Sequence, residues 1–265
     1  MRTVLTGLTF GESVRWHRDR VWFCDWVQGE VVAATPDGQR EVMARVDTMP
    51  FCIDWLPSGD LLATAGGQAR LLRQRDGALE TYADLSAITT KPWNEVAVHA
   101  SGNAYANSIN FDFPGGEYRP GLIALVRPDG TAVTVAEDIA FPNGMVITGS
   151  TLIVAESYAA RLTAFTIDPD GGLSDRRVWA DLGEGAAPDG IGLDPNGDVW
   201  VADVPNQSCT LVREGGEVLR RVDTPLGCFS CAVGDATLYM VVADYSDPAK
   251  MFSSQTGLLL AEDIG

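Results

Sequence analysis

The chain of 265 residues carries 36 acidic and 19 basic side chains, for a formal net charge of −17. This balance disfavours binding to nucleic acid or to an anionic membrane. No apolar run reaches transmembrane length, and the start, MRTVLTGLTFGES, lacks the apolar core of a signal peptide. We therefore expect a cytoplasmic protein, a monomer or weak oligomer, whose five cysteines are reduced thiols.

In chain order, residues 1–10 are predicted to form a single strand, and six similar units follow. The clearest unit, Pro188 to Asp203, alternates apolar and polar residues on both sides of the turn residues DPNG, as a half-buried hairpin does. The repeats return roughly every forty to fifty residues, the period of propeller blades. They begin at Glu12, Phe51, Asn94, Asn143, Asp189 and Ser230.

Residues 256–262 read as a second single strand, and its pairing with residues 1–10 closes a ring. The sequence therefore predicts an all-β fold, a six-bladed β-propeller, formed by one domain over residues 1–265. No helical periodicity competes with this interpretation. The blade that starts at Asn94 carries the longest insertion, residues 109–121, which is rich in aromatic, acidic and glycine residues. This loop is either a lid over the channel or a long connector.

The six leading positions are predicted to line one mouth of a central channel, because innermost strands start at the same end of a propeller. Glu12, Asn94, Asn143 and Asp189 bring side-chain oxygens to this ring. Hard oxygen donors with two negative charges suit a hard divalent cation. Taken singly, each of these residues could instead be an ordinary turn residue.

Several common catalytic motifs are missing from the chain, including GxSxG, HExxH, the P-loop and GxGxxG. The two histidines, His17 and His99, fall in turns at the far ends of their strands, so a histidine base is not expected. The CxxC spacing of Cys228 and Cys231 has no second pair, and we interpret it as structural.

The motifs GESVRW, FPNGMVI, RLTAFTIDPDGGLSDRRVW and PDGIGLDPNGDVWVA resemble, in order and spacing, the SMP-30/gluconolactonase/luciferin-regenerating enzyme family. The resemblance covers nearly the whole chain. It implies a six-bladed propeller with one divalent metal ion in the central channel, and lactonase activity. It assigns Glu12, Asn143 and Asp189 as metal ligands and Asn94 as a further contact for metal and substrate. Calcium is the first candidate for the ion, with zinc, magnesium or manganese as alternatives.

The resulting hypothesis is a hydrolase that opens lactone rings, with the metal as Lewis acid and Asp189 as general base. Gly144 and Gly190 allow close approach of backbone beside the ligands. Two alternatives stay open: a phosphotriesterase or aryl esterase on the same site, and a non-catalytic propeller that binds a small molecule.

One departure from the family concerns the substrate. Sugar lactonases of the family often have Arg-x-Asn-Asp in the third blade, whereas this chain has Pro92-Trp93-Asn94-Glu95, with Lys91 one place away. We assign Trp93, Asn94, Asn107 and Glu117 as substrate-binding candidates. Together with the aromatic residues of the 109–121 loop, Trp93 predicts a preference for lactones with apolar substituents. Asn107, Asn110 and Glu117 could instead turn inward and bind a sugar.

Overall fold

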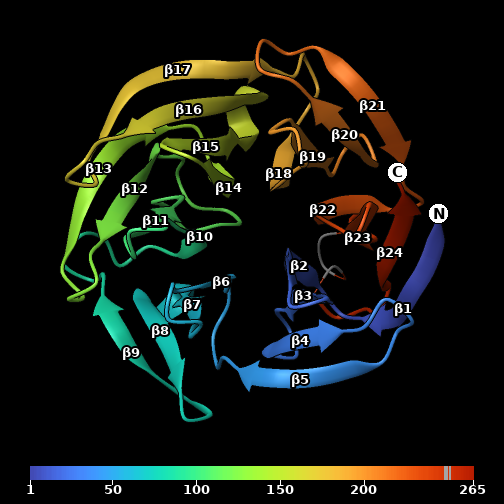
Figure 1. Ribbon diagram of the computed structural model, residues 1–265, viewed down its shortest axis with the longest axis horizontal. Helices are drawn as coiled ribbons and strands as arrows, with labels where there is room; N and C mark the ends of the chain where they lie inside the picture. The colour runs from blue at the N-terminus through green and yellow to red at the C-terminus, as the bar shows by residue number, and fades with distance from the viewer. Residues whose placement is uncertain (248–249, 251) are drawn as a thin grey trace.

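The computed structural model, which describes residues 1–247, 250 and 252–265, is built from six four-stranded antiparallel sheets. The sheets are arranged as blades around one axis, with the chain passing from blade to blade in order (Figure 1). This architecture confirms the predicted six-bladed β-propeller.

Each of the first five blades is formed by four consecutive strands, with the first strand innermost. Blade 1 holds β2 (Gly11–His17), β3 (Arg20–Asp25), β4 (Glu30–Ala34) and β5 (Arg40–Arg45), and blade 2 holds β6 (Ile53–Trp55), β7 (Leu61–Ala65), β8 (Arg70–Arg75) and β9 (Ala78–Asp84). Blade 3 holds β10 (Trp93–Val98), β11 (Ala104–Ser108), β12 (Gly121–Val126) and β13 (Ala132–Ile139). Blade 4 holds β14 (Pro142–Thr148), β15 (Thr151–Glu156), β16 (Arg161–Ile167) and β17 (Leu173–Asp181), and blade 5 holds β18 (Pro188–Leu193), β19 (Val199–Asp203), β20 (Ser208–Val212) and β21 (Val218–Asp223).

Blade 6 joins the two ends of the chain. It contains β22 (Gly227–Gly234), β23 (Thr237–Ala243) and β24 (Gly257–Asp263), and its outermost strand is β1 (Arg2–Leu8). Arg2 pairs with Ala261 and Leu8 with Gly257, in antiparallel register. Two short 3-10 helices, η1 (Gly66–Gln68) and η2 (Ser157–Ala159), follow second strands. Within the described part of the chain, no helix is long and apolar enough to span a membrane.

Local chemistry explains the hairpins. In the turn between β18 and β19, Oδ1 of Asp194 accepts hydrogen bonds from the backbone N–H groups of Asn196 and Asp198, both at 2.8 Å. Gly197 adopts a φ of 88°, which glycine reaches without a steric penalty. A short polar turn of this kind lets the apolar alternation resume at once in the next strand.

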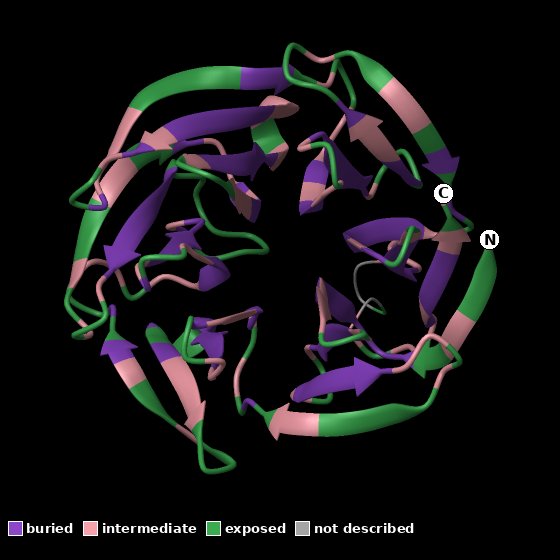
Figure 2. Ribbon diagram, viewed as in Figure 1, coloured by how far each residue is buried: buried purple, intermediate pink, exposed green. Residues whose placement is uncertain are grey.

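The hydrophobic core lies mainly between neighbouring blades. Phe23 of blade 1 and Tyr239 of blade 6 share one apolar cluster, and Ile153 of blade 4 and Val201 of blade 5 share another. Buried residues dominate the inner and middle strands, whereas outermost strands carry many exposed residues (Figure 2). The polar residues at the starts of the innermost strands are thus set in a rigid apolar frame.

Candidate functional site

Four of the predicted ring residues occupy the same register position in their blades. In each blade, the residue just before the ring residue pairs with the last residue of the second strand. The pairing register then shifts within the next three residues. These pairs are Gly11 with Asp25, Trp93 with Ser108, Pro142 with Glu156, and Pro188 with Asp203. Equivalent positions of a closed ring face the same end of its axis, so the structure places Glu12, Asn94, Asn143 and Asp189 at one end of the channel.

The prediction for blade 6 was wrong by two positions. Gly227 pairs with Ala243, and Ser230 pairs with Val241 after a bulge, so the residue equivalent to Asp189 is Cys228. The Cys228 thiol is fully buried. Phe51, the ring residue of blade 2, is also fully buried, in the core cluster between blades 1 and 2. Oxygen donors therefore come from blades 1, 3, 4 and 5.

Side-chain contacts link the ring residues. Nδ2 of Asn94 donates to Oδ1 of Asn143 at 3.2 Å, and Nδ2 of Asn143 contacts Oγ of Ser157 at 3.4 Å. Oε2 of Glu12 accepts a 3.3 Å hydrogen bond from the N–H of Ser13. Oδ1 of Asp189 is buried and lacks a hydrogen-bond partner among the described residues. An orphaned carboxylate oxygen is costly unless a proton or a cation satisfies it.

The two carboxylates of the ring also lack a cationic partner in the part of the chain that the structure describes. Burial raises the pKa of Glu12 well above 4.5, and the nearby charge of Asp189 raises it further. Burial likewise raises the pKa of Asp189, although its contact with the Asn143 amide opposes this. The neighbouring acid, Glu95, is paired with Arg15 at 2.8 Å. Within the described residues, no lysine, arginine or histidine forms an ion pair with Glu12 or Asp189.

These donors fit a hard divalent cation, because they combine two carboxylates with an amide carbonyl. Over the residues that the structure describes, no group of three or more histidine, cysteine, aspartate or glutamate side chains could hold a metal ion. The ring does not need such a group, since one of its three candidate ligands, Asn143, is an amide. The unpartnered Oδ1 of Asp189 is the atom that a cation would satisfy.

Hydrogen bonds between adjacent blades fix the starts of the innermost strands. Each contact uses a hydroxyl or amide side chain of one blade and the backbone of the next. In two of them the side chain accepts: Ser230 Oγ accepts from Val14 N (2.9 Å) and Ser13 Oγ accepts from Ile53 N (2.9 Å). In the other three the side chain donates: Thr64 Oγ1 to Asn94 O (3.0 Å), Asn107 Nδ2 to Asn143 O (2.7 Å) and Ser157 Oγ to Pro188 O (2.6 Å). These hydrogen bonds fix the position of each ring residue relative to the backbone of the neighbouring blade.

Glycines allow the same strands to approach closely, as predicted. A Cβ on Gly144 would lie 2.6 Å from the backbone N of Ile191 and 2.7 Å from the carbonyl O of Asp189. A Cβ on Gly190 would collide with Ser230. Larger residues at either position would push blade 5 away from its neighbour.

A set of polar residues that the sequence pattern did not single out anchors the segments leading into the ring. They end the second strand of a blade. Asp25 accepts from the N–H groups of Thr9 (3.0 Å) and Phe10 (3.2 Å), and Oε2 of Glu156 accepts from Ala140 N (2.7 Å). The equivalent residue at the end of the second strand is Asp203 in blade 5 and Ser108 in blade 3. Their regular spacing after Glu12, Asn94, Asn143 and Asp189 was the available signal.

The other substrate-binding candidates have different environments. Trp93 is fully buried in the cluster between blades 2 and 3, and its Nε1 donates to Thr89 O at 3.2 Å. It forms no open wall of the channel, contrary to the expected apolar face. Asn107 is also fully buried, with Oδ1 accepting from Glu95 N at 3.2 Å, so it positions strands. Glu117 is exposed in the long loop, where Lys91 pairs with Asp112 at 2.7 Å.

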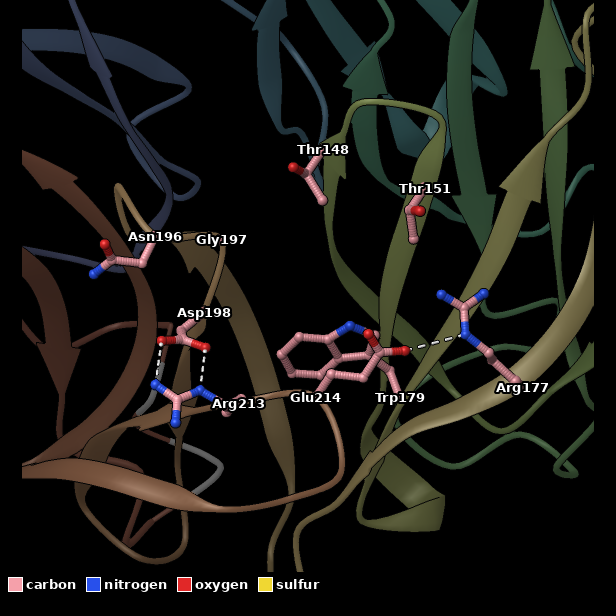
Figure 3. Close-up of a pocket in the computed structure, with 9 residues that line it drawn as sticks. All are labelled: Thr148, Thr151, Arg177, Trp179, Asn196, Gly197, Asp198, Arg213 and Glu214. Atoms are coloured by element: carbon pink, nitrogen blue, oxygen red, sulfur yellow. Dashed lines mark hydrogen bonds and ion pairs between the residues drawn. The ribbon is translucent and has the colours of Figure 1, made fainter.

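Two cavities lie away from the ring. A cavity of about 180 Å³ occupies the channel beyond it, lined by residues further along the innermost strands, such as Val14 and Ile191. A larger groove of about 320 Å³ lies between blades 4 and 5 (Figure 3). There Arg213 pairs with Asp198 and Arg177 with Glu214. This groove borders the β18–β19 turn, at the opposite end of β18 from Asp189, so it is separate from the ring.

Fold and site together define a six-bladed propeller with a polar ring, rich in carboxylate and amide groups, at one end of its channel. Residues 10–244 match the family model "SMP-30/Gluconolactonase/LRE-like region", and the chain belongs to this family.

Relatives by sequence include pentonolactonase XacC of Haloferax volcanii, 25% identical over 84% of this chain and 77% of that protein. Regucalcin of Gallus gallus is 24% identical over 79% of this chain and 70% of the relative. Among solved structures, a calcium-binding protein, regucalcin, from Agrobacterium tumefaciens superposes with a TM-score of 0.82. That match has 20% identity and covers 99% of this chain and 93% of the other, and it supports the fold.

Proposed function

We propose that this protein is a divalent-metal-dependent hydrolase that opens lactone rings, with Glu12, Asn143 and Asp189 as metal ligands. The observation that carries the proposal is the pair of carboxylates, the buried Glu12 and the half-buried Asp189, that share the ring with Asn143 and have no cationic partner among the residues that the structure describes. Family membership supports lactone hydrolysis, since one relative is named a pentonolactonase. The hard oxygen donors favour calcium, and zinc, magnesium and manganese are alternatives.

A cation held by Glu12, Asn143 and Asp189 would supply Lewis-acid polarisation of the lactone carbonyl. The carboxylate of Asp189 accepts a proton from the water that attacks the carbonyl carbon. The same proton then passes to the ring oxygen as the carbon–oxygen bond breaks. General-base catalysis of this kind contributes about two to four decades of rate. Asn94 orients Asn143 through its hydrogen bond.

Elemental analysis of the purified protein, followed by rate measurements with the metal found, tests this function. The variants are Asp189→Asn and Glu12→Gln, which keep side-chain size and remove charge. We expect both to lose bound metal and at least about a hundredfold in kcat/KM on lactones. Asp198→Asn is the control, because Asp198 lies at the opposite end of the same blade and pairs with Arg213. Full metal occupancy and unchanged rates in both ring variants would contradict the proposal.

The substrate panel also separates the alternatives. Faster turnover of phosphotriesters or aryl esters than of any lactone indicates the second hydrolase class. Bound metal without turnover of either class indicates a non-catalytic propeller that binds a small molecule.

A further inference from the structure

Five aromatic side chains from two blades form a continuous cluster at the end of the propeller that holds the ring. We call the cluster the aromatic wall. Ring centroids lie 4.6 Å apart for Phe141 and Tyr158, 5.2 Å for Phe113 and Phe141, and 5.6 Å for Phe111 and Tyr118. Phe111, Phe113 and Tyr118 come from the connection between β11 and β12, which reaches inward toward the propeller axis (Figure 1). Phe141 and Tyr158 belong to blade 4.

The wall is joined directly to the ring through Ser157. Tyr158 follows Ser157, whose Oγ contacts Asn143 Nδ2 at 3.4 Å and donates to Pro188 O at 2.6 Å, next to Asp189. The N–H of Ser157 donates to Phe141 O at 3.1 Å. Phe141 itself lies two residues before Asn143 in the chain. The hydrogen bonds that position the candidate metal ligands thus also position the base of the wall.

Three rings of the wall are about half exposed. Phe111 is 4% exposed and anchors the loop, whereas Phe113, Tyr118 and Tyr158 are 51%, 46% and 56% exposed. A patch of large apolar side chains beside a polar site is typical of small-molecule recognition, in which the apolar part of a ligand is buried and a few polar groups orient it. The exposed rings therefore offer area to bury, and the ring residues offer the polar contacts.

Several polar side chains in and beside this loop are engaged within the protein. Asn110 accepts from Thr89 Oγ1 at 3.1 Å and donates to Pro120 O at 3.2 Å. Asp112 is paired with Lys91, and Asn107 uses both ends of its amide on backbone groups. These amides and Asp112 already hold the loop in place, so among the described residues of the loop the hydroxyls of a sugar lactone would meet chiefly the exposed side chains of Glu117 and Arg119.

We propose that the aromatic wall binds an alkyl or aryl substituent of the substrate, so that the preferred substrates are lactones with apolar side chains and not polyhydroxylated sugar lactones. This inference rests on the proposed lactonase function. The rings of Phe113 and Tyr158 cover the apolar substituent while the lactone group faces Asn143 and Asp189.

Kinetics with three substrates test the proposal: a γ-lactone with a six-carbon alkyl chain, unsubstituted γ-butyrolactone and gluconolactone. We expect the wild-type kcat/KM to be about tenfold or more higher for the alkyl lactone than for gluconolactone, because burial of apolar area favours the former. The double variant Phe113→Ala/Tyr158→Ala, which alters exposed rings, should lose about tenfold on the alkyl lactone, mainly through KM, and little on γ-butyrolactone. Val218→Ala, an exposed apolar residue on an outermost strand, is the control.

Equal losses on all three lactones, or a tenfold preference of the wild type for gluconolactone, would overturn the role of the wall. A binding experiment separates this failure from failure of the proposed function. Calorimetric titration with the corresponding alkyl-substituted γ-lactam, which resists hydrolysis, should show tighter binding to wild type than to the double variant even if no lactone is turned over. Equal affinity of both proteins for the lactam, or no binding to either, contradicts the proposal.

Discussion

Nδ2 of Asn94 donates a 3.2 Å hydrogen bond to Oδ1 of Asn143, which joins the innermost strands of blades 3 and 4 at the channel. An amide oxygen has two lone pairs, so Oδ1 of Asn143 can accept this hydrogen bond and still face a cation. The contact sets the orientation of the one neutral member of the candidate ligand set. The backbone carbonyl of Asn143 is held separately, by Asn107 at 2.7 Å.

Removal of the orienting donor should weaken the site without unfolding the protein. We expect Asn94→Ala to lower metal affinity by about tenfold to a hundredfold, the usual effect of losing a partner that orients a ligand. Titration of the metal-free variant with calcium measures this change. Asn103→Ala, in the turn at the far end of β10, is the control. If Asn94→Ala bound calcium as tightly as the wild type does, the orientation of Asn143 would not depend on Asn94.

Metal removal should lower stability through the two ring carboxylates. Partial desolvation of both carboxylates opposes folding when no cation is bound, and a ligand that binds only the folded state stabilises it by about 2.7 kcal/mol at a hundred times its Kd. Calcium added to chelated protein should therefore raise the Tm. The Glu12→Gln/Asp189→Asn variant should show no such rise. The same calcium-dependent increase in wild type and variant would place the cation elsewhere.

Gly144→Ala should disturb the packing of blade 4 on blade 5. The new Cβ would lie 2.6 Å from Ile191 N and 2.7 Å from Asp189 O, so backbone must move. We expect a loss of about 1–3 kcal/mol in the free energy of unfolding, typical of overpacking, together with lower lactonase activity. Urea denaturation and kinetics measure the two effects. Gly172→Ala is the control, because its Cβ would meet mainly the movable side chain of Asp170, at 3.2 Å. Equal stability of the two variants would contradict the close approach at Gly144.

Glu156 should stabilise the protein in a pH-dependent way. Burial alone would raise the pKa of Glu156, but hydrogen bonds from Thr163 and Ala140 and the charge of Arg161 hold it below the usual 4.5. A lowered folded-state pKa means that the stabilisation is present above pH 4.5 and is lost as the pH falls through the lowered value. We expect Glu156→Gln to cost about 2–3 kcal/mol at neutral pH, since Arg161, Thr163 and the N–H of Ala140 lose a charged acceptor.

Urea denaturation of wild type and Glu156→Gln at pH 7 and at steps below pH 4.5 measures this dependence. The difference between the two proteins should shrink as the pH falls. The exposed acid Glu184, in the loop that leads into β18, provides the matched control variant Glu184→Gln. A difference that stays constant across the acid range would mean that Glu156 acts through its shape and not its charge.

Much of the candidate site was accessible from the sequence because the blades repeat. Glu12, Asn94, Asn143 and Asp189 start similar strand–turn–strand units, and the observed pairing gives them the same register. Trp93 could also have been placed correctly. Side chains alternate between the two faces of a strand, so a channel-facing Asn94 turns its neighbour Trp93 into the core.

Other positions depended on contacts that no local pattern encodes. The sequence places Ser230 at the start of the sixth unit, but the equivalent position is Cys228, because Gly227 pairs with Ala243, the last residue of β23. Which residue of β22 faces the end of β23 depends on the register between the two strands, and the pattern within β22 alone does not fix that register. The aromatic wall likewise joins Phe111 with Phe141 and Tyr158 across two blades.

The sequence by itself determined the number of blades and the oxygen-bearing residues that begin their innermost strands, because turn chemistry and period-2 alternation are local properties of the chain. Only the tertiary structure decided which of these oxygens lack a partner. That property depends on the neighbours that blade packing brings to each side chain: Arg15 reaches Glu95, whereas no cation among the described residues reaches Glu12 or Asp189.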